Sequence, residues 1–580
     1  MDDRRTLPIP AEHRELVVRV RGQPVPRTQH LLAVTIVKAV NRVSSAQLTW
    51  QDGAASDGRF PLSDGNLFVP GADVEVLAGT SDNPVSLFRG VVVRQSIKLR
   101  GHAGSRLVVD CRHKAVKLTV GRKSACYLDK TDADIVSGML DAAGLDKDVE
   151  ATSVKHAQVV QFRATDWDFL VTRAEANGRH VFTNDDKVVV KAPAVSGGAR
   201  FSLQFGATLL ELDAEVDARN QYHGVKGVTW DAAQQALVEH DAADPGIAGP
   251  GNLSSDDLAS VAALQALRLD HAALPDDEAQ AWADAGWIKS RLSKVSGRAR
   301  CEGIATVNPG DIVSMAGVGE RFNGDVYVTG VRHDSDPASG WKTHVQFGSV
   351  ARWFAEEHDV VAPPAGALVP AASGLQVAVV TSNEDPDGEH RVRVRLPMVE
   401  ADGDGIWARV AALDAGDDRG FFVRPELGDE VVVGFLDSDP RRAVLLGMLN
   451  SSAKAAPLKG SDDNHEKVFQ TRSKIRLYFN DDKKEVRVET PGGNKLTLSD
   501  DEQGMKFEDQ HGNVIEMNAD GVRIESAKAL KLKGNADVEV ESGTGLTAKG
   551  GTELKLEGAS AAELSSSGTT TIKGSLVKIN

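Results

Sequence analysis

The chain contains 580 residues, which is too long for one hydrophobic core and predicts about three or four domains. Its charged fraction of 26% and hydrophobic fraction of 41% are ordinary for a folded, soluble protein. The net charge of −16 argues against a nucleic-acid partner, because phosphate binding needs a clustered basic surface. Only 5% of the residues are aromatic and 55 are glycine, which favours short strands and turns over a large aromatic-lined pocket.

Cys111, Cys126 and Cys301 are too few for a disulfide framework, and they fit folding in a reducing cytoplasm. None has the close Cys/His spacing of a zinc site, so we expect no metal and no cofactor. The first residues are polar, and no apolar run approaches the roughly 18 residues of a membrane span. We therefore expect neither a secretory signal peptide nor a transmembrane segment.

The first part of the chain, residues 14–125, consists of short β-rich runs between turn residues and predicts a small β-barrel. Three helices are expected after it, because apolar stripes at helical spacing follow capping residues. They cover residues 131–144, 166–178 and about 276–295. Residues 231–275 carry little signal, and residues 244–251 within them are interpreted as a loop or a disordered insertion.

An internal echo predicts a second, similar barrel after the helices. Pro70-Gly71 precedes a strand-like run that is followed by Phe88-Arg-Gly90, and Pro309-Gly310 and Phe322-Asn-Gly324 stand in the same relation. Each pair is a Pro-Gly turn into a strand, followed by Phe-x-Gly into another strand. Pro-Gly turns before strands are common, so chance similarity is the alternative. We interpret the echo as a duplication and expect the second barrel at about residues 301–355.

A Pro/Ala/Gly-rich stretch at residues 361–370 marks a domain boundary. Five strand-like runs follow between residues 374 and 450, which is the size of an OB-type barrel. Such barrels often bind single-stranded nucleic acid through aromatic residues above a basic groove. The loops here are acidic, at 400–404 and 414–418, so we expect a structural collar without nucleic-acid binding.

The last sixty residues repeat with a period of eight. Each block has two positions two residues apart, mostly apolar, with a mostly charged or polar residue between them, and a small residue follows. These positions hold Val522 and Ile524, Leu530 and Leu532, Val538 and Val540, Leu546 and Ala548, Leu554 and Leu556, Ala562 and Leu564, and Thr570 and Ile572. Looser apolar pairs precede the blocks, from Ile475 to Met517.

One short strand per block cannot form a hydrophobic core by itself. Three copies that wind together remove the difficulty, because each chain supplies one wall of a triangular prism and the strands pair between chains. The large apolar residues of the repeat would then meet on the threefold axis. Two alternatives fit less well. A calcium-binding repeat would need Gly-Gly-x-Gly-x-Asp in blocks of nine. A disordered tail would not keep apolar residues in register.

These motifs resemble the VgrG family, the valine-glycine-repeat spikes of type VI secretion systems, over nearly the whole chain. The chain looks equally like the fused hub and spike of contractile phages and of extracellular contractile injection systems. Residues 309–333 look like the tail-hub pattern, and residues 166–178 are similar to its central helix. Residues 387–394, Trp407-Ala-Arg-Val and residues 425–442 resemble the OB barrel of the family.

The resemblance implies a mainly β homotrimer with a tail-hub domain, an OB-fold barrel and an intertwined triple-stranded β-helix. The hub domain would cover 1–365, with one barrel at 14–125, a helical or mixed insert at 126–300 and a second barrel at 301–355. A linker (366–373), the OB-fold domain (374–450), a second linker (451–470) and the β-helical needle (471–580) would follow.

The resemblance also implies a mechanical function. Two similar barrels in each of three chains would form a pseudo-sixfold ring that could seat a hexameric inner tube next to baseplate proteins. The needle would puncture a target cell envelope when a sheath contracts. The protein would be made in the bacterial cytoplasm and would end in an assembled particle, extracellular or virion-like after release.

The segment between barrel and needle, residues 451–470, is too short to hold the lysozyme domain of some relatives. The last repeat weakens towards the end of the sequence. We therefore expect a separate PAAR-like tip protein that contacts Lys578, Ile579 and Asn580. No histidine follows His511, so a histidine-ligated iron tip is not expected.

No Gly-x-Ser-x-Gly, HExxH, P-loop or dinucleotide fingerprint is present, so we expect no catalytic residues. Carboxylate pairs such as Glu356–Glu357 are interpreted as surface charge, and His333 and His344 as packing or surface residues. The alternative function is a trimeric tail fibre or adhesin with the same triple β-helix shaft. Fibres end in a globular receptor-binding head and lack a hub-like N-terminal region, which is the reverse of the arrangement expected here.

Overall fold

The computed structural model describes residues 16–579, apart from 57, 80–83, 101–103, 196, 232–233, 272–273, 358–359 and 361–370. The predicted boundary at 361–370, most of the expected linker 366–373 and the expected contact residue Asn580 lie outside the described residues. The chain divides into two compact units, Met1–Ser373 with Asp437–Pro440, and Gly374–Leu436 with Arg441–Asn580. Strands predominate in both, which confirms the mainly β fold. Within the described ranges, no helix is long and apolar enough to cross a membrane.

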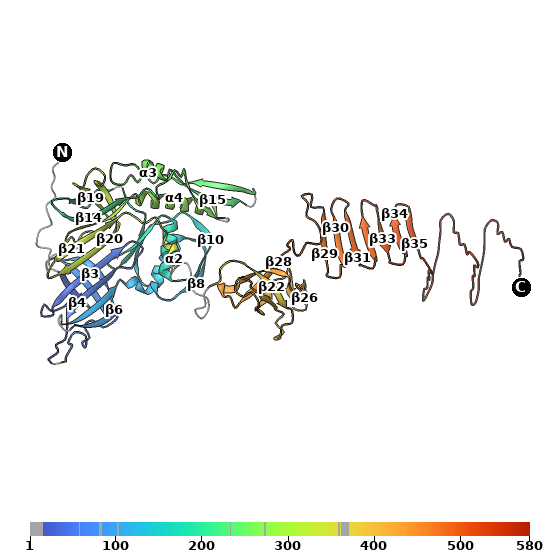
Figure 1. The fold of residues 1–580 in the computed structure, drawn as a ribbon, viewed down its shortest axis with the longest axis horizontal. Helices are drawn as coiled ribbons and strands as arrows, with labels where there is room; N and C mark the ends of the chain where they lie inside the picture. The colour runs from blue at the N-terminus through green and yellow to red at the C-terminus, as the bar shows by residue number, and fades with distance from the viewer. Residues whose placement is uncertain are drawn as a thin grey trace. The chain divides into compact units, whose positions relative to one another are not determined.

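Thirteen strands of the first unit form one sheet (Figure 1). Eleven of them follow the order β14-β18-β21-β20-β3-β4-β7-β6-β5-β1-β2, while β13 pairs with β19 and β19 pairs with β20. The earlier strands are β1 (Leu16–Val20), β2 (Gln23–Pro24), β3 (Leu31–Ala39), β4 (Ser45–Gln51), β5 (Asp73–Ala78), β6 (Val85–Arg100) and β7 (Gly104–Arg112). The later strands are β13 (Ser202–Gln204), β14 (Leu209–Val216), β18 (Val295–Glu302), β19 (Ile312–Ala316), β20 (Gly324–Asp336) and β21 (Gly340–Phe347).

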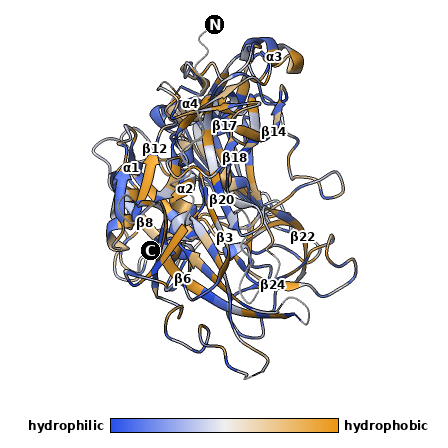
Figure 2. Ribbon diagram, turned by 90° about the vertical axis from the view of Figure 1, so that its left-hand side faces the viewer, coloured by the Kyte–Doolittle hydropathy of each residue, from blue (hydrophilic) through white to orange (hydrophobic). Residues whose placement is uncertain are grey.

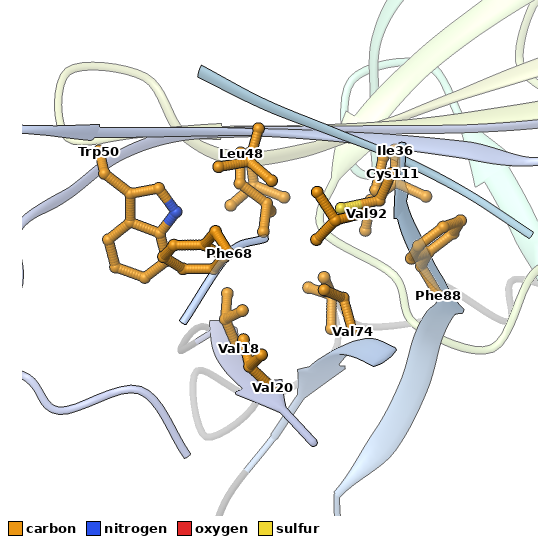
Figure 3. Packing of buried hydrophobic residues seen from close by; sticks show 14 of the residues in the cluster. Val18, Val20, Ile36, Leu48, Trp50, Phe68, Val74, Phe88, Val92 and Cys111 are labelled. Atoms are coloured by element: carbon orange, nitrogen blue, oxygen red, sulfur yellow. The ribbon is translucent and has the colours of Figure 1, made fainter. Parts of the chain in front are cut away.

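The first hydrophobic core is built mainly by β1 and β3 to β7. Apolar and polar residues alternate along these strands, so each strand turns one side inward. In Figure 3, Trp50, Phe68 and Val18 come from different segments and point toward one another. Cys111 is fully buried in this core, as the sequence predicts for a small hydrophobic residue. Its burial raises the pKa of the thiol to about 12.

A second core lies among β13, β14, β18, β19, β20 and β21, and Leu203, Val328 and Val345 are fully buried in it. The expected bounds of the second barrel, 301–355, are too narrow, because β13 and β14 lie inside the expected insert 126–300 and β18 begins there. The reason is that β14 and β18 are antiparallel neighbours separated by a long insertion. Their pairing therefore leaves no local pattern in the sequence.

The two Pro-Gly turns of the internal echo have the same local structure. Gly71 and Gly310 have φ angles of +93° and +96°, a backbone region that favours glycine. The Gly71 N–H donates to the Val92 carbonyl at 2.8 Å, and the Gly310 N–H donates to the Val328 carbonyl at 2.9 Å. The first unit therefore consists of two related β lobes, each with a core of its own.

The helices α1 (Asp132–Ala142) and α2 (Asp166–Ala176) lie where the sequence predicts them. Thr131 and Asp134 form the capping box that begins α1, and Gly178, at φ +65°, follows α2. A third core surrounds α2 and includes η2 (Lys114–Thr119) and β12, whose hydrophobic character stands out in Figure 2. The accompanying strands are β8 (Lys123–Thr131) with β10 (Lys155–Ala164), and β11 (His180–Asn184), β12 (Lys187–Lys191) and β9 (Asp146–Val149).

The region 231–275, where the sequence carries little signal, contains regular structure on both sides of the loop predicted at 244–251. It carries β16 (Ala236–Asp241), α3 (Ser255–Ala262) and β17 (Leu267–His271), and β15 (Val225–Asp231) pairs with both strands. The following helix α4 (Asp276–Leu292) confirms the third prediction but ends earlier, because Val295 already belongs to β18. The short helix η3 (Phe354–Glu356) comes after β21.

The OB-type barrel of the second unit is closed in the order β22-β23-β24-β28-β27. Its core holds fully buried valines, such as Val392, Val394 and Val431, so the predicted five-stranded domain is confirmed. The strands are β22 (Gln376–Ser382), β23 (Val392–Arg395), β24 (Ile406–Val410), β27 (Glu430–Phe435) and β28 (Ala443–Met448). A short ribbon, β25 (Ala415–Gly416) with β26 (Arg419–Gly420), and the 3-10 helix η5 (Leu436–Ser438) lie between them in sequence.

A seven-stranded antiparallel meander follows the barrel in sequence (Figure 1). Its strands are β29 (Glu466–Gln470), β30 (Arg476–Asn480), β31 (Glu485–Glu489), β32 (Lys495–Ser499), β33 (Gly504–Glu508), β34 (Val514–Asn518) and β35 (Gly521–Glu525). The expected linker 451–470 is therefore too long, because β29 already pairs with β30. From 526 to 579, the described chain consists of bends and irregular segments without a strand.

Candidate assembly site

One face of the meander carries two continuous columns of apolar side chains. Each strand contributes a residue that lies directly opposite an apolar residue of the next strand, as Leu477 does with Val488 and Val488 with Leu496. The first column contains Phe469, Leu477, Val488, Leu496, Phe507, Ile515 and Ile524. The second column contains Phe479, Val486, Leu498, Met505, Met517 and Val522. We call these the two apolar columns.

The opposite face of the meander is charged. Arg487 lies between Glu485 and Glu489 and covers the Tyr478 ring at 4.6 Å from its centroid. Farther along, the Arg523 guanidinium lies 2.7 Å from the Glu516 carboxylate. Pairs as exposed as the latter contribute little to stability, so this face is suited to water. The sheet is thus amphipathic, with a hydrated face and an apolar face.

The apolar face has no cover within the part of the chain that the structure describes. Phe507 is 44% exposed and Val522 is 66% exposed, although both belong to an ordered sheet. Transfer of one such side chain from water to a packed interior contributes roughly 1.5–3 kcal/mol. Burial of the thirteen side chains of the two apolar columns would therefore provide a large driving force for association.

Two of the predicted axis residues belong to the two apolar columns. Val522 and Ile524 are the last members in the meander, opposite Met517 and Ile515. The other nine lie beyond β35, where each is more than half exposed in the single chain: Leu530, Leu532, Val538, Val540, Leu546, Leu554, Leu556, Leu564 and Ile572. Of the expected tip contacts, Ile579 is 87% exposed.

Sequence reasoning missed the start of the columns. Phe469 on β29 was assigned to a linker, although it lies opposite Leu477 in the sheet. The adjacent apolar pair Val468-Phe469, between a charged and a polar neighbour, was the available signal, and it shows no alternation. It was weak because β29 is a single short strand before the first turn.

His333 and Cys301 of the first unit are engaged in packing, whereas Cys126 is exposed. His333 is buried, its Nδ1 lies 3.0 Å from the Thr343 hydroxyl, and burial lowers its pKa to about 3. His344 is less buried and lies 3.4 Å from the Asp334 carboxylate. Burial raises the pKa of the Cys301 thiol to about 12, which leaves it unreactive. Within the described ranges, no group of three or more His, Cys, Asp or Glu residues could hold a metal ion.

A buried ionic network joins the elements around α1 and α2. The Arg173 guanidinium donates to the Asp132 carboxylate at 2.7 Å and to Glu278 at 2.9 Å. His156 Nε2 lies 2.9 Å from Asp132, and the Asn177 amide donates to the same carboxylate at 2.8 Å. Burial alone would raise the pKa of Asp132, but the hydrogen bonds and the charge of Arg173 bring it below its ordinary value. The network locks α1, α2, β10 and α4 together.

Three family models match the chain. Residues 11–336 match the Alg8 N-terminal domain. Residues 376–449 match the type VI secretion system/phage-baseplate injector OB domain. Residues 485–580 match the phage baseplate V C-terminal trimerisation domain. The second range coincides with the closed barrel, and the third covers the meander from β31 onward together with the repeat.

Curated relatives match over a short part of their length. The type VI secretion system spike protein VgrG4b of Pseudomonas aeruginosa is 34% identical over 122 residues, which are 19% of this chain and 15% of the relative. Among solved structures, the 43 kDa tail protein of prophage MuSo2 from Shewanella oneidensis aligns with a TM-score of 0.43 and 13% identity, over 58% of this chain and 98% of that chain. The E. coli type VI secretion component c3393 aligns with a TM-score of 0.36 and 16% identity, over 74% and 99%.

The first family model spans more than half of the chain, and the other two follow it in the order barrel, then trimerisation domain. The chain therefore belongs to the family of the Alg8 N-terminal domain, and its injector OB and trimerisation domains make it a VgrG-like spike protein.

Proposed function

We propose that this protein is the homotrimeric central spike and hub of a contractile, phage-tail-like injection system. In that role it joins a hexameric inner tube to the baseplate and punctures a target envelope with its β-helical needle. The observation that carries the proposal is the pair of apolar columns, which run through the meander to Val522 and Ile524, where the repeat begins, and whose side chains are widely exposed in one chain.

A threefold arrangement is the simplest way to bury these columns. In a prism of three sheets, each apolar face meets the other two on the axis, and each charged face stays in water. The eleven repeat residues from Val522 to Ile572 are then the axial core of the needle. The trimerisation family model over residues 485–580 supports this assignment.

The two related lobes of the first unit support the role of a hub. Three chains with two lobes each offer six similar surfaces, which fits a hexameric tube ring. A mechanical task of this kind needs stiffness rather than chemistry, and the buried His333 and Cys301 side chains serve packing. We therefore propose a structural protein without catalytic activity, made in the bacterial cytoplasm and incorporated into a particle.

The residues near the C-terminal end of the repeat remain candidate contacts for a separate tip protein. Lys578 and Ile579 belong to the described chain, and Ile579 offers an exposed apolar side chain. A small PAAR-like protein is the partner that we propose for this end. Pull-down of such a protein should be lost when Ile579 is replaced by Asp, while trimer formation is kept.

The composition of native particles tests the proposed function. In the producing bacterium, an affinity-tagged copy of the chain should co-purify with sheath, inner-tube and baseplate proteins in fixed stoichiometry. Contraction of the particles should release the spike together with the tube. A chain that is isolated without tube and sheath proteins, and that attaches to cells by itself, would contradict the proposal and favour a trimeric fibre or adhesin.

A further inference from the structure

The two lobes of the first unit correspond strand for strand. The path β3-β4-β7-β6 in one lobe has the counterpart β14-β18-β21-β20 in the other, with antiparallel pairing at each step. Both paths also carry β-bulges at the same two places. The bulge at Val92–Arg94 of β6 corresponds to the bulge at Val328–Gly330 of β20. The bulge at Leu31–Ala33 of β3 corresponds to the bulge at Leu209–Glu211 of β14. Because bulges are specific local features, their coincidence fixes which residues correspond.

Within one chain, the lobes join edge to edge. The second half of β20 pairs with β3, from Gly330 opposite Ala39 to Ser335 opposite Val34. A side-chain bond strengthens this junction, because the Thr35 hydroxyl donates to Asp334 at 2.8 Å. The counterpart of β20 is β6, and the counterpart of β3 is β14. A repeat of the same junction would therefore place β6 against β14.

Both of these edges are open in the single chain. Strand β6 pairs with β5 only over Val85–Val91 and with β7 over Val91–Arg100, so one side of its second half has no neighbouring strand in the described part of the chain. Strand β14 stands at the end of the strand order and pairs with β18. The unpaired backbone groups of an open edge of this length can pair with a strand of another chain.

We propose that in the trimer the second half of β6 in one copy pairs antiparallel with β14 of the next copy, in the register that β20 and β3 define. This inference rests on the proposed trimer and adds the surface through which its hub domains meet. The bulge correspondence predicts the pairs Ile97 with Ala214, Lys98 with Asp213, Leu99 with Leu212, and Arg100 with Glu211.

The predicted pairs are complementary in charge. Lys98 and Arg100 make no ion pair within the described residues, although the chain carries a net charge of −16. Their predicted partners are carboxylates on an exposed edge strand. Asp213 lies 3.4 Å from Arg298 in its own chain, and a carboxylate can accept from a second cation as well. Opposite charges directly across two strands stabilise the pairing.

The predicted pairs also match in hydrophobic character. Ile97 is 47% exposed and Leu99 is 59% exposed, and they alternate with the charged residues along β6. In the predicted register they lie opposite Ala214 and Leu212, which are half-buried on β14. A shift by one residue would place Lys98 against Leu212 and Leu99 against Glu211, so the register is specified.

The contact is heterologous, because it joins two different strands. Repeated three times around a threefold axis, it closes on itself and leaves neither edge open. The sheet of each chain then continues into the next chain, alternating an internal junction with an intermolecular one. A ring of this kind would hold the hub together independently of the needle.

Cysteine cross-linking of the full-length chain tests the register. In a Cys126→Ser background, Leu99→Cys combined with Leu212→Cys should give cross-linked dimers and trimers on mild oxidation, which thiol reductant reverses. Residues directly opposite each other in an antiparallel pair lie within disulfide reach. The matched control is Leu99→Cys with Val216→Cys, which lies four residues out of register, roughly 13 Å along the strand. It should give at least tenfold less product.

Charge reversal and hydrogen exchange give two further readouts. Lys98→Asp should slow cross-linking of the Leu99/Leu212 pair several-fold, and Asp213→Lys in the same chain should restore it. In the unmodified trimer, the amides of residues 94–99 that point away from β7 should exchange slowly, which needs no variant to fold.

The outcomes separate the interface from the proposed function. A trimer by mass that neither cross-links in register nor protects these amides overturns the interface and leaves the spike function standing. Equal cross-linking of the control pair also overturns it. A monomer removes both the interface and the proposed function.

Discussion

The substitution Leu532→Asp tests the axial core most severely. In the single chain Leu532 is 73% exposed, so a charge there costs one chain almost nothing. In the proposed needle, three copies of the side chain meet on the axis. Loss of three buried leucines removes roughly 5–9 kcal/mol of association free energy. Each buried carboxylate adds a desolvation penalty of several kcal/mol, and the three repel one another.

The matched control is Lys531→Asp, which changes the adjacent, outward-facing position of the same block. We expect the wild type and the control to run as detergent-resistant trimers on unheated gels, and the Leu532→Asp variant to dissociate. Its N-terminal unit should stay folded, because that unit has hydrophobic cores of its own. Trimers of unchanged resistance in Leu532→Asp, or equal loss in the control, would refute the axial placement.

Three other predictions concern the first unit and are measured by urea unfolding. Gly310→Ala should destabilise the unit by roughly 1–2 kcal/mol, because Gly310 has a φ of +96° and a Cβ would lie 3.0 Å from the Phe182 ring. The control Gly138→Ala places its methyl group in open space on α1 and should not destabilise the unit. Asp132→Asn should cost up to about 3–5 kcal/mol, because it removes one of the two carboxylates that hold the buried Arg173 guanidinium and leaves only Glu278. Burial lowers the pKa of His333 to about 3, so stability is highest above the ordinary histidine pKa of about 6.5 and falls as the pH drops towards 3. His333→Gln should flatten that fall, and an unchanged pH profile would contradict it.

Local signals predicted the parts of the fold that are themselves local. The cap at Thr131 marks the start of α1 and Gly178 marks the end of α2, because each acts on the backbone within one helical turn. The five barrel strands of residues 374–450 and the repeat from Val522 onward were equally visible, since a strict alternation predicts one buried face.

Features that depend on distant partners were not visible. The pairing of β14 with β18 joins segments separated by a long insertion, so the second lobe was placed too late in the sequence. Strand β29 needed its neighbour β30 to be recognised. The buried network of Asp132, His156 and Arg173 draws on three elements, and no spacing in the sequence relates them.

Light scattering of the purified full-length chain tests the central claim most directly. We predict a single species with three times the 61.8 kDa mass of one chain, at all concentrations down to the nanomolar range. A stable species of 61.8 kDa, whose apolar repeat stays in water, would contradict the needle and the spike built on it.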